Sequence, residues 1–328
     1  MSTPETVTYR EAINRALRDA MQADENVILL GEDIGAAGGT FKLTEGLQEV
    51  FGPDRVMDTP ISETGFVGAS IGLALAGFRP VAEMMFSDFA AVAFDQIVNE
   101  APKYLFMSAG QMNVPLVIRC TGGGGLRFGA QHSATTESWY LTIPGLKVVA
   151  AATPQDAYGL MLSAIADPNP VVYLEHKKLM GSTGPLDPSE GPVPLGKARV
   201  LRSGEDVTLV ATLAMVPVAL EAAERLAGEG VEAEVIDLRS LLPFDGETVV
   251  ESVRRTGRLI TIEEQPVYGG WGSSVAAEVV DKAFDYLDYP PLRLGTPAAP
   301  IAFSPVLEDA AIPSVERVMA AVRTVRGE

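Results

Sequence analysis

The chain has 328 residues, of which 47% are hydrophobic and 7% aromatic, so we expect a globular protein of about two domains. Its formal net charge of −18, from 43 acidic and 25 basic side chains, argues against general binding of nucleic acid or of an anionic membrane, because both need a basic surface. Cys120 is the single cysteine, which excludes disulfides within the chain and metal sites built from several cysteines.

The first half of the chain alternates short apolar segments with helical stretches, which is typical of a parallel sheet covered by helices. A helix is predicted from Thr8 to Met21, because Thr8 and Glu11 form a capping box and the following apolar residues share one face. The predicted strands are 27–30, 55–57, 79–85, 115–120, 146–151 and 171–175, and further helices are predicted at 43–50, 88–106 and 154–166. The first ten residues carry no apolar signal region, and no uninterrupted apolar run approaches the roughly 18 residues of a membrane span. We therefore expect a soluble, cytoplasmic protein.

A segment with four prolines and four glycines, residues 181–196, precedes a second alternation of strands and helices. The predicted strands there are 207–211, 234–238, 259–263 and 292–294, and the predicted helices are 216–227, 247–255 and 273–284. We therefore predict an α/β protein of two doubly wound domains with mainly parallel sheets. The domains are expected at residues 1–180 and 197–328, joined by a linker at 181–196.

Residues 58–77, DTPISETGFVGASIGLALAG, are the most unusual stretch of the chain. Glu63 stands before a helix that contains Gly65, Gly68 and Gly72. A glycine inside a helix costs roughly 1 kcal/mol relative to alanine, so this spacing indicates close approach by another backbone or by a flat ligand. A carboxyl group at this position, just after a strand, lies where α/β proteins bind ligands. A buried helix preceded by a solvated glutamate fits the same pattern, and the residues alone leave both interpretations open.

Glycine-rich segments elsewhere do not form a phosphate-binding motif. Residues 191–198, GPVPLGKA, resemble a phosphate loop, but Ala198 replaces the hydroxyl that binds Mg²⁺, and two prolines remove N–H donors. The dinucleotide pattern G-x-G-x-x-G after a strand is absent. The run Gly122–Gly125 is compatible with an anion-binding nest and equally with a flexible loop.

The chain has only two histidines and no H-E-x-x-H pattern, which makes a histidine-based metal site improbable. His132 follows the glycine run in the segment AQHS and is expected near the carboxyl edge of a sheet. A histidine there can act as an acid or base near neutral pH. A histidine hydrogen-bonded within a loop is the alternative.

Seven segments identify a family when they are taken together in their order. They are DTPISETGFVGASIGLALAGFRPVAE, FDQIVNEAPK, AQHSATTESWY, IPGLKVV, DVTLVAT, EVIDLRSLLPFD and GGWGSSVAAEV. From about Thr8 to its C-terminus, the chain closely resembles the β subunit of the thiamine-diphosphate-dependent first component of 2-oxo acid dehydrogenase complexes. The pyruvate and acetoin versions are the nearest. The resemblance implies a pyrimidine-binding domain, a C-terminal domain of the transketolase type, and an oxidoreductase of the pyruvate dehydrogenase (acetyl-transferring) type that passes the acyl group to a lipoyl group.

The resemblance also implies roles for individual residues. Glu63 matches the glutamate that contacts the pyrimidine nitrogen and promotes activation of the cofactor. Phe89 and Met85 match cofactor-binding positions, and Phe89 is expected to stack on the pyrimidine ring. His132 matches the histidine that faces the substrate carbonyl and the lipoyl arm. Gln131 stands where many branched-chain-type relatives carry tyrosine or histidine, which favours pyruvate or acetoin as substrate.

Further expectations concern metals and partners. Family β subunits bind a structural K⁺ through loop carbonyls, and the matching positions are Leu116, Ala164, Ile165, Asp167 and Asn169. In the family, a Gly-Asp-Gly … Asn segment holds Mg²⁺ and the diphosphate. This chain lacks that segment, and FDGET at residues 244–248 is the stretch most similar to it. The resemblance therefore implies an α subunit that supplies most of the diphosphate and Mg²⁺ site within an α₂β₂ heterotetramer. It also implies docking to a dihydrolipoyl acyltransferase core and its lipoyl domain, and the acidic charge suits a small basic docking domain.

Other functions remain open at this point. The same component acting on acetoin or a branched-chain 2-oxo acid is one alternative. A split transketolase-like or deoxyxylulose-synthase-like transferase is another, although SETGFVG and AQHS fit it less well. A non-catalytic acidic scaffold that binds a partner is the alternative outside enzymes.

Overall fold

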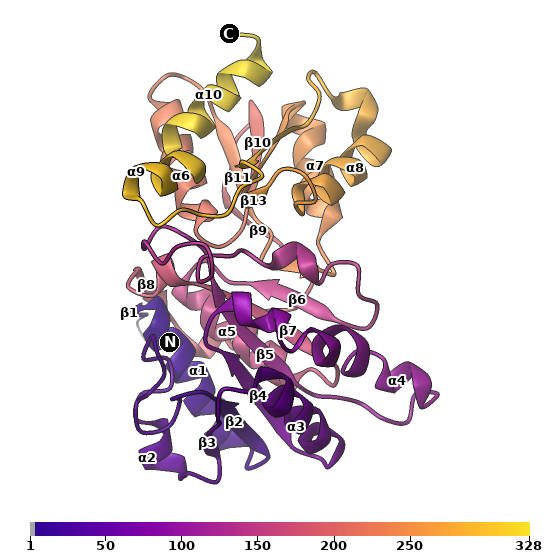
Figure 1. The fold of residues 1–328 in the computed structure, drawn as a ribbon. Helices are drawn as coiled ribbons and strands as arrows, with labels where there is room; N and C mark the ends of the chain where they lie inside the picture. The colour runs from indigo at the N-terminus through magenta and orange to yellow at the C-terminus, as the bar shows by residue number, and fades with distance from the viewer. Residues whose placement is uncertain (1–3) are drawn as a thin grey trace. The chain divides into compact units, whose positions relative to one another are not determined.

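The computed structural model describes residues 4–328, which divide into two compact units (Figure 1). Unit 1 comprises residues 4–122 and 139–195, and unit 2 comprises Gly123–Ser138 and Gly196–Glu328. Both are α/β units built on a mainly parallel sheet, as predicted. Within residues 4–328, no helix combines the length and the apolar character needed to cross a bilayer.

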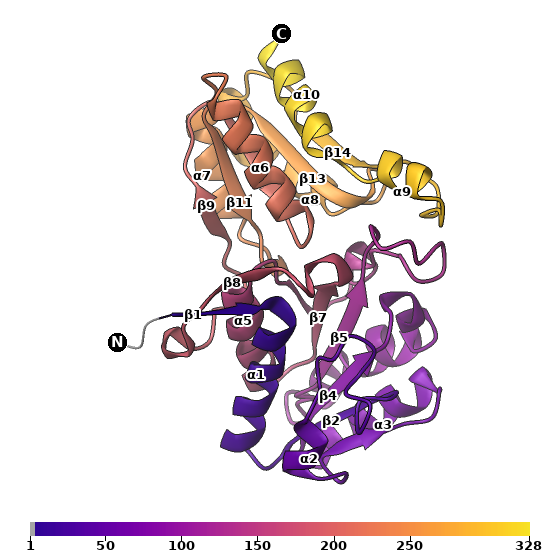
Figure 2. The same cartoon turned by 90° about the vertical axis from the view of Figure 1, so that its left-hand side faces the viewer.

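Unit 1 contains a parallel sheet in which the strands follow the order β6-β7-β5-β4-β2-β3. In Figure 2, α1 and α5 cover one face of this sheet and α3 covers the other. The strands are β2 (Val27–Gly31), β3 (Val56–Asp58), β4 (Arg79–Met84), β5 (Val117–Gly122), β6 (Lys147–Ala150) and β7 (Val171–His176). The helices are α1 (Tyr9–Ala23), α2 (Leu47–Phe51), α3 (Glu63–Leu75), α4 (Tyr104–Met107) and α5 (Pro154–Ala166). All these strands point the same way, so their carboxyl ends form one edge where ligands bind in such folds.

Helix α1 begins where the sequence predicts. The Thr8 backbone N–H donates to Glu11 Oε2 at 2.7 Å, and the Glu11 N–H donates to Thr8 Oγ1 at 3.3 Å, so the capping box is formed. The apolar face of α1 is buried and packs against α5. The local cap and the 3.6-residue period therefore define this helix without help from distant residues.

The single helix predicted at 88–106 is wrong. The chain instead forms a 3₁₀ turn at Ser87–Ala91, a π-helical turn at Gln96–Glu100 and the short helix α4. Pro102 lacks an N–H and its ring clashes with a preceding carbonyl, so a regular helix cannot run through it. Just before the proline, the Ala101 N–H donates to the carbonyl of Gln96, five residues back, at 3.0 Å.

Two other predicted segments differ in detail. The helix predicted at 43–50 begins later, as α2, because Gly46 precedes it in the left-handed conformation with φ 72°. Within the predicted linker, β8 (Thr183–Leu186) pairs antiparallel with β1 (Glu5–Thr8), and the sequence analysis identified neither strand. These strands are four residues each and lack an alternating apolar pattern, which explains why they were missed.

Unit 2 has its own sheet, with the order β14-β13-β10-β11-β9 and β9 antiparallel to β11. The strands of this sheet are β9 (Arg199–Arg202), β10 (Val207–Ala211), β11 (Ala233–Asp237), β13 (Leu259–Pro266) and β14 (Leu292–Thr296), and unit 2 also contains β12 (Ser240–Leu242), which lies outside this sheet. Its helices are α6 (Met215–Ala227), α7 (Gly246–Thr256), α8 (Gly272–Ala283), α9 (Pro305–Ala311) and α10 (Val315–Arg326). Helices α6 and α10 pack together, as do α7 and α8, and Figure 1 shows the two pairs on opposite faces of the sheet. Four elements of unit 2 were not predicted from the sequence: β9, β12, α9 and α10.

Two buried carboxyl groups make unit 2 sensitive to pH. Glu137 is 3% exposed, and its burial, together with the nearby charges of Glu264 and Glu263, raises its pKa to about 8. Burial also raises the pKa of Glu263 to about 7. The unfolded chain releases both protons near pH 4.5, whereas the folded chain keeps them to higher pH. Stability is therefore lost as pH rises from about 4.5 to about 8.

We expect the free energy of unfolding to fall by about 2 kcal/mol between pH 6 and pH 8 on account of Glu137. Glu137→Gln cannot ionise and should remove most of this fall. Urea unfolding at the two pH values, followed by tryptophan fluorescence, measures it. Glu229→Gln, a change at an exposed carboxylate of the same unit, should keep the wild-type pH dependence. A Glu137→Gln protein with the wild-type slope would contradict the assignment.

Candidate active site

Glu63 lies at the carboxyl edge of the unit 1 sheet. It is the first residue of α3, which follows β3 after a short turn, and it is only 6% exposed. The N-terminus of a helix favours a negative charge, so the fold supports a carboxylate at this place. The alternative interpretation, in which Glu63 is a solvated glutamate before a buried helix, is therefore excluded.

A second carboxyl group, which the sequence analysis missed, belongs to Glu32. It follows β2, is 6% exposed, and its Oε1 has no hydrogen-bond partner among the described residues. Burial is the main cause that raises the pKa of Glu32, and the negative charges of Glu63 and Asp33 raise it further. Two carboxyl groups that repel each other's charge favour a state in which one of them holds a proton. The signal was available in the sequence, because GED directly follows the predicted strand 27–30.

Met85 and Phe89 lie at the same edge of the sheet. They follow β4, which is paired in parallel with β2, and both are half-buried. The Phe89 ring meets Phe86 edge to face, with ring centroids 5.7 Å apart, and Phe86 meets Phe41 in the same way at 5.8 Å. This aromatic cluster fixes the position of Phe89. Unit 1 thus brings Glu63, Met85 and Phe89 to one edge.

The glycines of α3 have different environments. A Cβ at Gly68 would lie 3.2 Å from Oε1 of Gln96, which is a tight contact with the end of a side chain. At Gly65 a Cβ would lie 2.8 Å from Ser62 Oγ, whereas at Gly72 it would meet nothing within 4 Å. Gly65, Ala69 and Gly72 are exposed on unit 1. Among the described residues, a Cβ would therefore be crowded at Gly65 and Gly68 and would have open space at Gly72.

His132 belongs to unit 2, in the segment Gly123–Ser138. It is half-buried, and its backbone N–H donates to the carbonyl of Gly129 at 3.4 Å. Gly129 has φ 77°, which turns the chain just before the histidine. The predicted site residues are thus distributed over both units, with His132 in unit 2.

The predicted potassium ligands lie where β5 begins and where α5 ends in unit 1: Leu116, Ala164, Ile165, Asp167 and Asn169. Two of these positions already contact cationic side chains. The Ile165 carbonyl accepts from Arg79 Nη1 at 2.9 Å, and the Asp167 carboxylate forms an ion pair with Lys147. Of the predicted carbonyl ligands, that of Ile165 thus already accepts from an arginine, whereas Lys147 contacts the Asp167 side chain and not its carbonyl.

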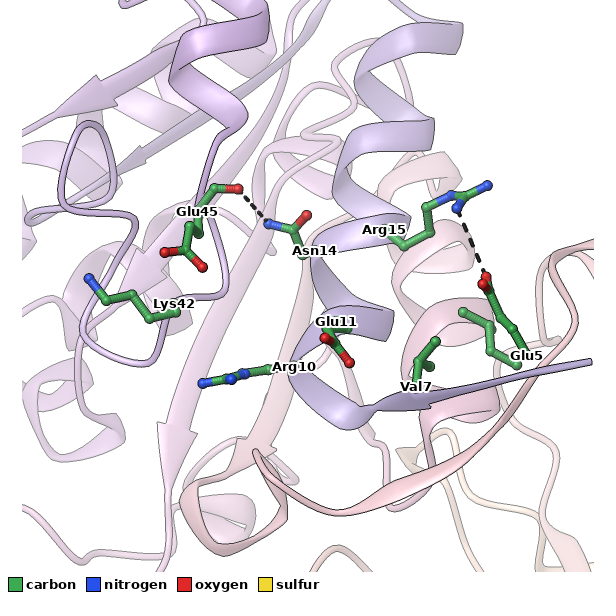
Figure 3. A pocket seen from close by; sticks show the side chains of 9 residues that line it. Glu5, Val7, Arg10, Glu11, Asn14, Arg15, Lys42 and Glu45 are labelled. Carbon is green, nitrogen blue, oxygen red and sulfur yellow. Dashed lines mark hydrogen bonds and ion pairs between the residues drawn. The ribbon is translucent and has the colours of Figure 1, made fainter.

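Figure 3 shows a polar pocket of about 310 Å³ beside α1 in unit 1, and its lining contains none of the predicted site residues. Asn14 crosses from α1 and donates to the carbonyls of Leu43 and Glu45 at 2.9 and 3.1 Å. Arg15 on its rim forms ion pairs with Asp19 and Glu5. These polar groups join α1 to the neighbouring loop and strand, which is a structural role.

Comparison with known families covers both units. Residues 5–182 match the transketolase pyrimidine binding domain, and residues 196–318 match the transketolase C-terminal domain. A solved structure described as a split gene transketolase, inactive β4 tetramer, aligns with a TM-score of 0.79 and 29% sequence identity over 97% of this chain and 98% of that one.

Relatives of known function are similar over nearly the full length. The mitochondrial pyruvate dehydrogenase E1 component subunit beta-1 of Arabidopsis thaliana is 45% identical over 96% of this chain and 88% of its own. The pyruvate dehydrogenase E1 component subunit beta of Rickettsia bellii is 44% identical over 97% and 98%. The beta subunit of the acetoin:2,6-dichlorophenolindophenol oxidoreductase of Bacillus subtilis is 43% identical over 98% of each chain. The chain therefore belongs to the family of β subunits of the thiamine-diphosphate-dependent E1 component, with its transketolase-type pyrimidine-binding and C-terminal domains.

Proposed function

We propose that this chain is the β subunit of an enzyme that oxidatively decarboxylates pyruvate and transfers the acyl group to a lipoyl group. The observation that carries the proposal is Glu63, buried at the start of α3 on the carboxyl edge of the unit 1 sheet. The 43–45% identity to E1-type subunits, against 29% to a split transketolase, favours this reaction over sugar transfer. Acetoin and branched-chain 2-oxo acids are the alternative substrates.

The cofactor in this proposal is thiamine diphosphate. When bound, it supplies a carbon nucleophile that can attack the carbonyl of a 2-oxo acid. Glu63 would contact the pyrimidine ring, and Phe89 and Met85 would line its place. The unpartnered Oε1 of buried Glu32 and the half-buried Phe89 ring at the same edge suit a planar, polar heterocycle.

Glu32 would keep its proton to higher pH than an exposed carboxyl group at this edge, because burial and the negative charges of Glu63 and Asp33 raise its pKa. His132 would orient the 2-oxo acid or assist acyl transfer, since an imidazole can exchange a proton near neutral pH.

An α subunit is part of the proposal, because the relatives are named as beta subunits. The exposed small residues Gly65, Ala69 and Gly72 of α3 would let another backbone approach closely. In unit 2, Phe303, Val306 and Leu307 are 72%, 77% and 60% exposed, which is typical of a surface that a partner covers. The α subunit would bring most of the diphosphate and Mg²⁺ site in an α₂β₂ assembly.

The proposal has three finer parts. Docking to a dihydrolipoyl acyltransferase core rests on the acidic charge of −18 and the family relation. A structural K⁺ bound by the loop carbonyls would have to share the Ile165 carbonyl with Arg79. A cytoplasmic location would match bacterial relatives such as that of Rickettsia bellii, whereas the Arabidopsis relative is named mitochondrial.

A substrate assay with the assembled α and β subunits tests the proposed function. With Mg²⁺, thiamine diphosphate and an artificial electron acceptor, we expect turnover of pyruvate, and kcat/KM for pyruvate at least about tenfold above that for acetoin or a branched-chain 2-oxo acid. Each subunit alone serves as control and should be inactive. Preference for another 2-oxo acid or acetoin would move the assignment to that substrate, and activity on sugar phosphates alone would overturn it.

A further inference from the structure

We propose that Glu264, Gln265 and Glu308 are positioning residues that hold the loop carrying His132. This loop, residues 123–138, is called the His132 loop below. The inference rests on the proposed role of His132. The contacts cited below join residues of unit 2 alone, so they do not depend on how the two units are placed.

The first anchor holds the beginning of the His132 loop. Its backbone N–H groups donate to the buried carboxylates of Glu308 and Glu264. Glu308 on α9 is 0% exposed, and its two oxygens accept from the N–H groups of Gly125 at 2.7 Å and Arg127 at 3.1 Å. Glu264 at the end of β13 is 6% exposed and accepts from the N–H of Gly124. The glycine run is therefore an anion nest that binds the protein's own carboxylates.

The glycines are needed for this approach. A Cβ at Gly124 would lie 2.9 Å from Ile312 and 3.3 Å from a carboxylate oxygen of each of Glu264 and Glu308. Gly125 has φ 88°, which a residue with a side chain rarely adopts. The sequence left open whether the glycine run is an anion nest or a flexible loop. In the structure it is a nest, and the anions it binds are carboxylates of the same chain.

The Arg127 side chain strengthens the first anchor. Its Nη1 lies 2.5 Å from Glu308 Oε2, and its Nη2 donates to Asp309 Oδ2 at 2.8 Å. Glu308 thus receives two backbone donors and one charged donor, and charge-assisted bonds of this kind are the strong ones. Arg127 also has φ 65°, an unfavourable conformation that these bonds maintain.

The second anchor lies on the other side of His132. Thr135 Oγ1 donates to the backbone carbonyl of Glu264 at 2.9 Å, and Gln265 Nε2 donates to the carbonyl of Thr135 at 2.9 Å. Ser138 Oγ donates to Gln265 Oε1 at 2.7 Å. The end of β13 therefore binds both ends of the loop, and the segment 128–134 with His132 lies between the anchors. A catalytic group held in this way keeps its place, and a misplacement of about 1 Å can cost 100-fold in rate.

Glu308→Gln tests the first anchor. The amide keeps the size of the side chain but replaces one acceptor oxygen by an NH₂ donor, so at least one loop N–H loses its partner. Trypsin reports the release of the loop, because Arg127 is the only lysine or arginine between Arg119 and Lys147. In the full-length chain we expect cleavage after Arg127 to accelerate about tenfold. Mass spectrometry identifies the fragments.

Two further variants make the proteolysis result specific. Thr135→Val removes a bond of the second anchor and should also accelerate cleavage after Arg127. Glu234→Gln changes another carboxylate of unit 2, 3% exposed and paired with Arg255 at 2.6 Å, and should cleave at the wild-type rate. Unchanged cleavage in both loop variants would overturn the inference, whatever the activity of the enzyme.

Turnover by the assembled enzyme shows whether the anchors act through His132. We expect His132→Gln and Glu308→Gln each to lower kcat, and the double variant to be no slower than His132→Gln alone. If the two losses multiply, Glu308 does not act through His132 and the inference fails. If His132→Gln alone turns over normally, the proposed role of His132 fails, while the proteolysis result still decides whether the anchors hold the loop.

Discussion

Replacing Glu63 by glutamine will lower the turnover number of the assembled enzyme at least about 100-fold. Glutamine has nearly the same shape as glutamate, but an amide can neither release nor take up a proton near neutral pH. Glu63 is buried at the start of α3. Its neighbour Glu32 would also lose the negative charge that helps to raise its pKa. The measurement is kcat for pyruvate at saturating thiamine diphosphate.

A matched change at an exposed carboxylate provides the control. Glu49→Gln lies on the surface of unit 1, in α2, and should leave kcat within about twofold of the wild type. Circular dichroism and the Tm of both variants should match the parent chain. A Glu63→Gln enzyme that assembles, binds the cofactor and turns over normally would contradict the proposed mechanism.

Replacing Arg119 by methionine will lower the free energy of unfolding by about 3–5 kcal/mol. Arg119 on β5 is 1% exposed and donates to Glu83 on β4 at 2.6 Å and to Glu175 on β7 at 2.7 and 3.1 Å. Thr121 Oγ1 also donates to Glu175 at 2.8 Å. Without the guanidinium group, two carboxylates remain buried with no positive partner. Burial already raises the pKa of Glu83 in the intact cluster.

The loss in Arg119→Met should depend on pH. A carboxyl group with a raised pKa binds its proton more tightly in the folded chain, so the variant becomes less stable as pH rises. Urea unfolding at pH 5 and pH 8 should therefore show the smaller loss at pH 5. Arg15→Met is the matched control, because Arg15 is 48% exposed and pairs with Asp19 on the surface; its cost should stay below about 1 kcal/mol. An equal loss of unfolding free energy in Arg119→Met and Arg15→Met would contradict a stabilising role of the buried Arg119 ion pairs.

Features that depend on neighbouring residues were predictable from the sequence. The capping box of Thr8 and Glu11 defines the start of α1 through bonds three residues apart, and apolar runs gave the buried strands β2, β5 and β7. Glu63 was found because a carboxyl group stands between a strand and a glycine-rich helix, which in α/β folds means the carboxyl edge of the sheet.

Features that depend on distant contacts were not predictable from local patterns. The segment Gly123–Ser138 belongs to unit 2 because it bonds to Glu264 and Glu308, at sequence separations of 129 to 183 residues. The position of Glu32 after a strand was visible in the sequence, but its burial and its proximity to the charge of Glu63 depend on the folded sheet. The helix predicted at 88–106 is wrong for a local reason, because Pro102 cannot continue a regular helix.

Calorimetric titration of Mg²⁺–thiamine diphosphate tests the central claim most directly, namely that this chain supplies the pyrimidine half of a cofactor site completed by an α subunit. The titration is made into the chain alone and into the assembled α and β subunits. We expect binding to the assembled pair and none to the lone chain, because the described edge offers Glu63, Phe89 and Met85 but the sequence lacks a diphosphate motif. Tight binding to the lone chain would contradict the shared site, and absence of binding to a correctly assembled pair would contradict the cofactor itself.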